Sequence, residues 1–172
     1  KMAKQLSLHN EQQHRLAYRD SMTGLRNATS YKAWTDEFDT KIGDTIKEFG
    51  IAVLDINYLK ITNDKYGHDV GDKLIVAVAK IISSTFKRSP VFRIGGDEFL
   101  VILQNRDLEE SKELGEIFDA ECAGGYIETN KGNVPICIAR GFAKFNPGTD
   151  NQFVDVFNRA DDAMYQHKRK MK

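Results

Sequence analysis

Acidic residues flank two short apolar segments of strand character in this chain. Asp55 ends the apolar run 51–54, and Asp97 and Glu98 follow a Gly-Gly pair and open a second apolar run. If the two strands are neighbours, Asp55 and Asp97 converge at one edge of a sheet, and carboxylates that meet there repel one another unless a cation lies between them. Mg²⁺ is commonly held by one or two carboxylates together with substrate phosphates. The alternative is that these acids are exposed turn residues, and spacing alone leaves both interpretations open.

A second polar segment, residues 63–72, carries side chains suited to a nucleobase. The amide of Asn63 and the carboxylate of Asp72 could together read a guanine edge, because a carboxylate accepts hydrogen bonds from the N–H groups of the base. Taken alone, the segment is better explained by Asn63 as a turn residue and Asp72 as a helix N-cap. His68 is interpreted as a structural loop histidine.

Two lysines are candidates for binding phosphates. Lys60 follows Asp55 by five residues, so it lies above the same site if that segment turns. Lys168 follows Met164 by one helical turn, so its stem can track a packed face while its ammonium group reaches the surface. Each could instead be a solvated surface charge.

An alternation of helices and strands must position these residues. Hydrophobic periodicity and turn signals predict helices over about 29–49, 59–63, 72–86, 107–122 and 151–169. Strands are expected at 51–54, 91–94 and 98–103, with a loop at 66–71 and a second hairpin-like pair within 125–145 that turns at 130–132. Because the Gly-Gly pair predicts a hairpin, with tight turns that need positive φ, the sheet is mixed or antiparallel. An α+β fold is therefore favoured over a doubly wound parallel sheet.

Capping residues are expected for two of these helices. Thr29 or Ser30 can cap the helix that runs to about residue 49, which Gly50 would end. Asp107 is expected to cap the helix to about residue 122, with Glu110 three places on as in a capping box.

The N-terminal segment 1–19 reads as a polar helix with sparse apolar positions. It is either a frayed, solvated helix or the end of a parallel coiled coil that enters from an upstream domain, and one or two heptads are too few to decide. The chain begins at Lys1 rather than at a natural start, so we expect an upstream part.

Composition excludes several classes of protein. The 172 residues include 25 Lys and Arg against 25 Asp and Glu, so a coat for nucleic acid, which needs positive charge, is not expected. Cys122 and Cys137 form no CxxC motif, which favours a reducing cytoplasmic setting over a disulfide framework. The longest apolar run, 74–79, is far shorter than the roughly 20 residues of a membrane span.

Residues 93–99 read RIGGDEF and resemble the signature of the GGDEF family, the diguanylate cyclases. Four further motifs occur in the order that the family has them. These are DSMTGLRN at 20–27, similar to DxLTGLxN; DINYLKITND at 55–64, similar to DxDxFKxxND; GHDVGD at 67–72, similar to GHxxGD; and ADDAMYQHK at 160–168, similar to ADxALYxAK. The resemblance covers about residues 20–170, which makes 20–172 the expected GGDEF domain and 1–19 a signalling or linker helix.

The resemblance implies a fold similar to the palm of nucleotidyl cyclases and polymerases, with a central, mostly antiparallel sheet surrounded by helices. It implies condensation of two GTP molecules to cyclic di-GMP with release of pyrophosphate, dependent on Mg²⁺ or Mn²⁺. Each domain binds one GTP, so two domains must meet face to face as a homodimer, through the active-site faces and the N-terminal helix. An upstream sensor domain is expected, in a cytoplasmic protein whose upstream part could be anchored in a membrane, with no nucleic acid as partner.

The resemblance also assigns roles to individual residues. Asp55, the Ile56 carbonyl and Asp97 match metal ligands. Asp97 is in addition a candidate base for the attacking 3′-hydroxyl, and Glu98 supports the metal region. The remaining matches concern the substrate: guanine for Asn63 and Asp72, the substrate loop for His68, and phosphates for Lys60, which also counts as catalytic, and Lys168.

The chain departs from the family pattern at several positions. Asn57 stands where many members have a second Asp, Ala28 where Arg is common, and Ala139 where many relatives have Ser. Many members bind their product at an RxxD motif, whose places are taken here by Phe86 and Ser89, so product inhibition through that site is not expected. The alternative to an active cyclase is a catalytically inactive GTP-binding regulatory module.

Overall fold

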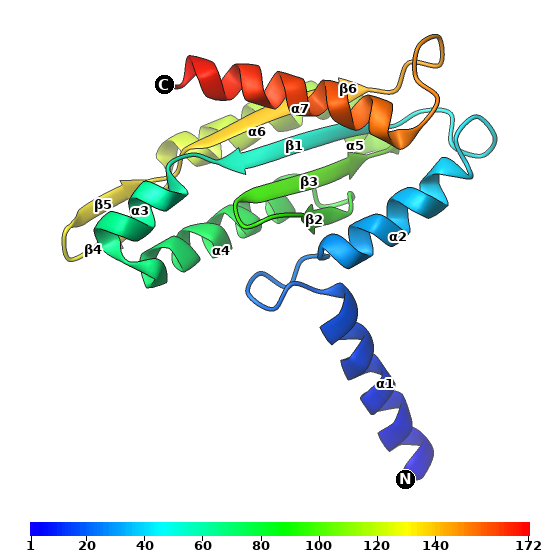
Figure 1. The fold of residues 1–172 in the computed structure, drawn as a ribbon, viewed down its shortest axis with the longest axis horizontal. Helices are drawn as coiled ribbons and strands as arrows, with labels where there is room; N and C mark the ends of the chain where they lie inside the picture. Colours follow the sequence, from blue (N-terminus) through cyan, green and yellow to red (C-terminus); the bar gives the residue numbers. More distant parts are fainter.

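A four-stranded antiparallel sheet in the order β2-β3-β1-β6 forms the centre of the computed structural model, which describes all 172 residues (Figure 1). Its strands are β1 (Gly50–Ile56), β2 (Val91–Arg93), β3 (Glu98–Leu103) and β6 (Ile138–Lys144). A separate small sheet pairs β4 (Tyr126–Thr129) with β5 (Gly132–Pro135). The helices are α1 (Met2–Tyr18), α2 (Ala28–Asp39), α3 (Leu59–Tyr66), α4 (His68–Thr85), α5 (Asn105–Glu109), α6 (Ser111–Gly124) and α7 (Phe153–Lys170).

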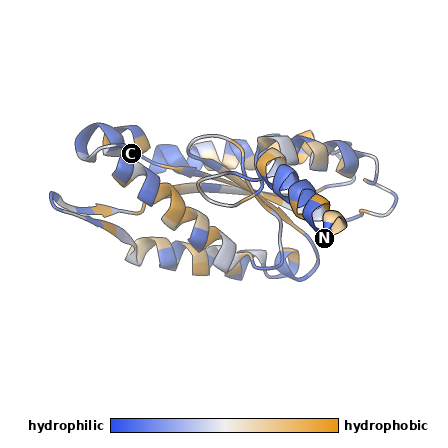
Figure 2. Ribbon diagram, turned by 90° about the horizontal axis from the view of Figure 1, so that it is seen from below, coloured by the Kyte–Doolittle hydropathy of each residue, from blue (hydrophilic) through white to orange (hydrophobic).

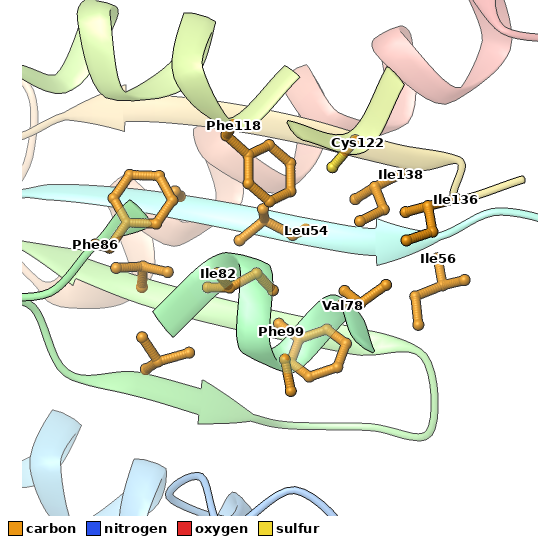
Figure 3. Packing of buried hydrophobic residues seen from close by; sticks show 14 of the residues in the cluster. Leu54, Ile56, Val78, Ile82, Phe86, Phe99, Phe118, Cys122, Ile136 and Ile138 are labelled. Carbon is orange, nitrogen blue, oxygen red and sulfur yellow. The ribbon is translucent and has the colours of Figure 1, made fainter. Parts of the chain in front are cut away.

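The central sheet is covered on both faces, and strand β1 shows this most clearly. All seven of its residues are buried, and they alternate between two clusters because successive side chains of a strand point to opposite faces. Leu54 and Ile56 pack with α4 and α6, in the cluster drawn in Figure 3. Ile51 and Val53 pack with α2 and α7 on the other face. The near-continuous apolar sequence of β1 thus reflects burial on two sides.

Helix α7 approaches the sheet closely at Gly141 of β6. A Cβ atom built on Gly141 would lie 2.1 Å from the carbonyl oxygen of Ala160 and 2.1 Å from the main-chain nitrogen of Met164. Only glycine allows this contact between the helix backbone and the strand. The close packing carries the C-terminal turn of α7 toward the end of β1.

The expected α+β fold with an antiparallel sheet is confirmed, as is the hairpin of β2 and β3. The reason given for its Gly-Gly turn is wrong, because neither Gly95 nor Gly96 has a positive φ. The Arg93 side chain holds the turn instead, since its Nη2 donates to the Gly96 carbonyl at 2.8 Å. The turn at 130–132 is confirmed, and Gly132 there has φ 108°.

The first predicted helix of the domain is about ten residues too long. Its N-cap is Asn27, whose side chain accepts from the Ser30 main chain, and the helix ends at Asp39 instead of continuing to about 49. Ile42 and Ile46 were expected on a helical face, but they pack against the core from a turn that contains Gly43 at φ 85°. Spacing by four residues does not distinguish a helix from a turn that folds back on itself.

Two other helix boundaries differ from the prediction. Most of the expected loop 66–71 is helical, because only Gly67, at φ 93°, separates α3 from α4, and Asp72 lies inside α4 rather than capping it. The segment 107–122 is divided between α5 and α6, and Asp107 is buried within α5. Asp107 accepts a hydrogen bond from the Ser89 hydroxyl at 2.6 Å, so a tertiary contact has replaced the predicted cap.

Helix α1 projects away from the rest of the chain and buries none of its residues (Figure 1). In Figure 2 the ribbon of this helix is coloured mostly as hydrophilic, with scattered hydrophobic residues. Leu6 and Leu16 are 62% and 77% exposed. The coiled coil therefore stays a prediction. No helix of the chain combines the length and the apolar character that crossing a bilayer requires.

Candidate active site

The register of β1 against β3 brings the acidic residues together. Asp55 lies opposite Glu98 in the antiparallel ladder. The main-chain N–H of Ile56 donates to the carbonyl of Asp97 at 2.9 Å, which fixes the Gly-Gly turn to the end of β1. The convergence of Asp55 and Asp97 that the sequence predicted on condition of neighbouring strands is therefore present in the fold.

Lys168, in the last turn of α7, reaches this cluster from above the sheet. Its Nζ lies 2.6 Å from Oδ1 of Asp55, and both side chains are largely buried, at 29% and 12% exposed. Burial alone would lower the pKa of Lys168, but the hydrogen bond to Asp55 and the neighbouring carboxylates raise it above its ordinary value. The lysine thus stays charged beside the acids.

The neighbouring carboxylates repel one another. Burial raises the pKa of Asp55, and the charges of Asp97 and Asp161 raise it further, which outweighs the ion pair with Lys168. The pKa of Glu98 is raised for the same reasons, burial first and then the charges of the three aspartates. Burial, together with the neighbouring carboxylates, therefore outweighs the one lysine at this cluster.

Asp161, which the sequence prediction did not single out, lies close enough to the cluster for its charge to raise the pKa values of Asp55 and Glu98. It lies on α7 seven residues before Lys168, and this spacing of two helical turns places both on one face. The spacing within 160–168 was the signal that could have found it.

Arg93 and Asp20 hold the Gly-Gly turn in place, and neither was predicted to do so. Nη1 of Arg93 lies 3.1 Å from both carboxylate oxygens of Asp20. Burial alone would raise the pKa of Asp20, but hydrogen bonds from Thr23 and Arg93 outweigh it and leave the pKa below its ordinary value. The motif at 20–27 therefore supports the signature turn, although the two segments are far apart in the sequence.

The proposed guanine residues lie on α3 and α4, apart from the acidic cluster. The side chain of Asn63 packs against Gly71, where an added Cβ would lie 1.7 Å from Oδ1 of the asparagine. That Oδ1 is buried and has no hydrogen-bond partner. Asp72 follows Gly71 on α4 and is exposed. The amide oxygen of Asn63 thus lies against Gly71, and the carboxylate of Asp72 is free on the surface.

Lys60 and His68 are brought to the same region, although no contact joins them to it. Lys60 is exposed in the first turn of α3, one turn before Asn63. His68 is exposed at the first residue of α4 rather than in a loop. Neither side chain forms a tertiary hydrogen bond or ion pair, so both are free to meet a ligand.

The donor set can be compared with the needs of a metal ion. No group of three or more His, Cys, Asp or Glu side chains converges as a ready-made metal site. Mg²⁺ does not need one, since it usually takes one or two carboxylates and completes its shell with phosphate and water oxygens. Asp55 and Asp97, with the Ile56 carbonyl between β1 and the turn, supply oxygen ligands of this kind.

The departures from the family pattern are accommodated differently. Asn57 is buried, with Nδ2 lying 3.5 Å from Sγ of Cys137 and 3.3 Å from Sδ of Met171. Ala139 is fully buried under α7. Nothing in the structure explains Ala28, which is exposed at the start of α2.

Comparison with known proteins agrees with these observations. Residues 17–172 match the family model "Diguanylate cyclase, GGDEF domain". Diguanylate cyclase DgcP of Pseudomonas aeruginosa is 30% identical over 171 residues, which is 97% of this chain and 25% of that protein. A diguanylate cyclase of Vibrio cholerae is 30% identical over 163 residues, 92% of this chain and 49% of that protein. The chain therefore spans a quarter to a half of the length of these relatives.

The solved structures include a close likeness in fold. The coiled coil and GGDEF domain of DgcB from Caulobacter crescentus, in complex with c-di-GMP, superposes with a TM-score of 0.85 at 28% identity, covering 98% of this chain and 90% of that one. The GGDEF domain of FimX from Pseudomonas aeruginosa shares the fold with a TM-score of 0.79 at 19% identity, over 89% of this chain and 94% of that one. By sequence, by fold and by the motifs at its sheet edge, the chain belongs to the GGDEF, or diguanylate cyclase, domain family.

Proposed function

We propose that residues 20–172 form an active diguanylate cyclase domain that condenses two GTP molecules into cyclic di-GMP. The observation that carries this proposal is the meeting of Asp55, Asp97 and Glu98 where β1 ends and β3 begins, with Asp55 opposite Glu98 in the ladder. A cluster that is acidic and also holds a lysine suits a magnesium nucleotide better than a free nucleotide.

In the proposed reaction, the 3′-hydroxyl oxygen of each GTP attacks the α-phosphorus of the other. Each new P–O bond forms as the bond to pyrophosphate breaks, so two GTP give one cyclic di-GMP and two pyrophosphates. Asp97 accepts the proton of the hydroxyl, and Glu98 supports the same region. Lys60 and Lys168 bind phosphate oxygens and offset their charge.

Asp55, Asp97 and the Ile56 carbonyl would hold Mg²⁺ or Mn²⁺. When bound, the metal supplies positive charge against the phosphates. Asn63 and Asp72 would read guanine, with His68 beside the substrate at the first residue of α4. A carboxylate at Asp72 favours guanine over adenine, because it accepts from the N–H groups that guanine presents.

Turnover requires two GTP-loaded domains, so we propose a homodimer through the active-site faces with α1 as its coiled-coil connection. The exposed Leu6 and Leu16 support this role for α1. The relatives named above are longer than this chain, which supports an upstream sensor domain. Two free cysteines support a cytoplasmic setting for the domain.

The test is an assay of cyclic di-GMP formation by a dimer forced through a coiled coil fused before residue 1. With GTP and Mg²⁺, we expect product from the wild-type dimer and none from Asp97→Ala. Asp162→Ala is the matched control, because Asp162 is an exposed carboxylate on α7 outside the cluster. A wild-type dimer that binds GTP and makes no product would refute the proposal.

That last result would support the second candidate, an inactive GTP-binding regulatory module. The observation in its favour is the ion pair between Lys168 and Asp55, which engages a proposed metal ligand. Calorimetry with GTP in Mg²⁺ would distinguish this module from a domain that binds only other proteins and no nucleotide.

We also propose that the product does not inhibit through the RxxD positions. Phe86 is 4% exposed and belongs to the core, and Ser89 is engaged by Asp107. Neither side chain offers the guanidinium or carboxylate that the motif supplies. Calorimetry with cyclic di-GMP on Asp97→Ala should show no tight binding, and submicromolar affinity there would contradict the proposal.

A further inference from the structure

The last turn of α7 is attached to the edge of the sheet by a histidine. Nδ1 of His167 accepts a hydrogen bond from the main-chain N–H of Arg140, on β6, at 3.0 Å. Strand β6 is the edge of the four-stranded sheet, so this N–H has no further strand to bind. A neutral imidazole accepts at one nitrogen only, so the bond fixes the proton on Nε2.

Arg140 is a firm anchor for this contact. Its guanidinium binds Asp119 of α6 through two hydrogen bonds, each of 2.7 Å. Gly115 of α6 leaves room for that side chain, because an added Cβ there would lie 3.1 Å from Nη1. One strand residue thus connects α6, β6 and α7.

The residue after His167 is Lys168, whose Nζ lies 2.6 Å from Asp55. The same turn is held at its other end, where Sδ of Met171 lies 3.3 Å from Nδ2 of Asn57. Between these points, Arg169 and Lys170 are exposed, and their side chains form no tertiary hydrogen bond or ion pair. The Tyr58 hydroxyl adds a hydrogen bond to the Met171 carbonyl at 3.4 Å. Helix ends fray unless their termini are held, so these contacts on either side of Lys168 determine how well it is placed.

We propose that His167 is a positioning residue, which holds the C-terminal turn of α7 on β6 and so keeps Lys168 at Asp55. Its relevance to catalysis rests on the proposed cyclase function. The family pattern at 160–168 has alanine at this place, and alanine has no acceptor for the Arg140 N–H. This attachment is therefore a feature of this chain and not of the motif.

The test compares two substitutions of His167 with a control. His167→Ala removes the acceptor, whereas His167→Asn keeps an acceptor oxygen at a similar distance from the backbone. Gln166→Ala, at an exposed neighbouring position, is the control. Two measurements need no turnover: hydrogen exchange of the Arg140 amide by NMR, and the rate of acetylation of Lys168 followed by mass spectrometry.

For His167→Ala we expect the exchange of the Arg140 amide and the acetylation of Lys168 to become faster by about tenfold or more. His167→Asn should restore both rates to those of the wild type, and Gln166→Ala should leave both rates unchanged. In the forced dimer, kcat should fall by about 10- to 100-fold while KM for GTP changes little, because the guanine residues on α3 and α4 do not move. Unchanged amide exchange or unchanged Lys168 reactivity in His167→Ala would overturn the proposal. An inactive wild-type dimer would refute the cyclase function alone, since the first two measurements still decide whether His167 holds the turn.

Discussion

The backbone of α7 packs directly against Gly141 of β6, and Gly141→Ala is the most direct test of this contact. The new Cβ would meet two backbone atoms at 2.1 Å, those of Ala160 and Met164. Ordinary contacts between non-bonded heavy atoms lie at about 3.5 Å. Since backbone atoms cannot rotate away, α7 must retreat from the sheet by about 1 Å.

The expected cost follows from that displacement. A gap of about 1 Å loses a quarter to a half of the dispersion energy of the atoms it separates, here the contacts of Val156 and Ala160 with the sheet. Together with the usual cost of overpacking, the free energy of unfolding should fall by about 3 kcal/mol. For a domain of this size, the midpoint of thermal unfolding should fall by about 6–12 °C. Lys168 moves with the helix, so turnover should fall by about 100-fold.

Thermal and denaturant unfolding of the variant would measure the first effect, and the cyclic di-GMP assay the second. Gly124→Ala is the matched control, because a Cβ on Gly124 would meet nothing within 4 Å and its φ is not positive. Its stability should stay within about 0.5 kcal/mol of the wild type. A shift in unfolding temperature of about 2 °C corresponds to about half a kcal/mol in the free energy of unfolding. If Gly141→Ala unfolds within about 2 °C of the wild type, the argument from close packing is wrong.

Three further predictions follow from the charges and thiols. Asp20→Asn should lower the free energy of unfolding by about 1–2 kcal/mol at pH 7. Because folding lowers the pKa of Asp20, this difference should shrink in denaturation curves recorded at pH values falling below about 4, and a constant difference would contradict the prediction. Burial raises the pKa of Cys122 to about 12, so iodoacetamide at pH 8 should label Cys137 first and Cys122 only after unfolding, whereas equal labelling by mass spectrometry would refute this. The raised pKa values of Asp55 and Glu98 mean that the charged forms of these two side chains destabilise the fold at high pH. Mg²⁺ should therefore raise the unfolding temperature more at pH 8 than at pH 5.5, with EDTA as the control. The opposite order would argue against a metal at these residues.

Local sequence was a good guide wherever the physical cause is local. The hairpin of β2 and β3 could be predicted because two apolar runs flank a Gly-Gly pair, and strand β1 because its run ends at a polar residue. The helix predicted to about residue 49 failed because the spacing of Ile42 and Ile46 also fits a turn packed on the core. Asp107 failed as a cap because its carboxylate binds Ser89, which is distant in sequence.

The candidate site shows the same division. The ordered motifs were enough to name Asp55, Asp97, Glu98 and Lys168 as candidates. Hydrophobic patterning placed each of them near the end of a predicted strand or helix. Their contacts could not be predicted, because the register between β1 and β3 and the path of α7 across the sheet depend on the whole core.

The sequence by itself therefore determined the family, the fold class and the residue types available for chemistry, because these depend on motifs and on local periodicity. Only the tertiary structure decided that Asp161 on α7 joins the acidic cluster of β1 and β3, that Arg93 pairs with Asp20, and that His167 attaches the last turn of α7 to Arg140. Each of these contacts joins elements whose separation along the chain is closed only when the two faces of the sheet are packed, so no window of sequence contains both partners together with the reason that they meet.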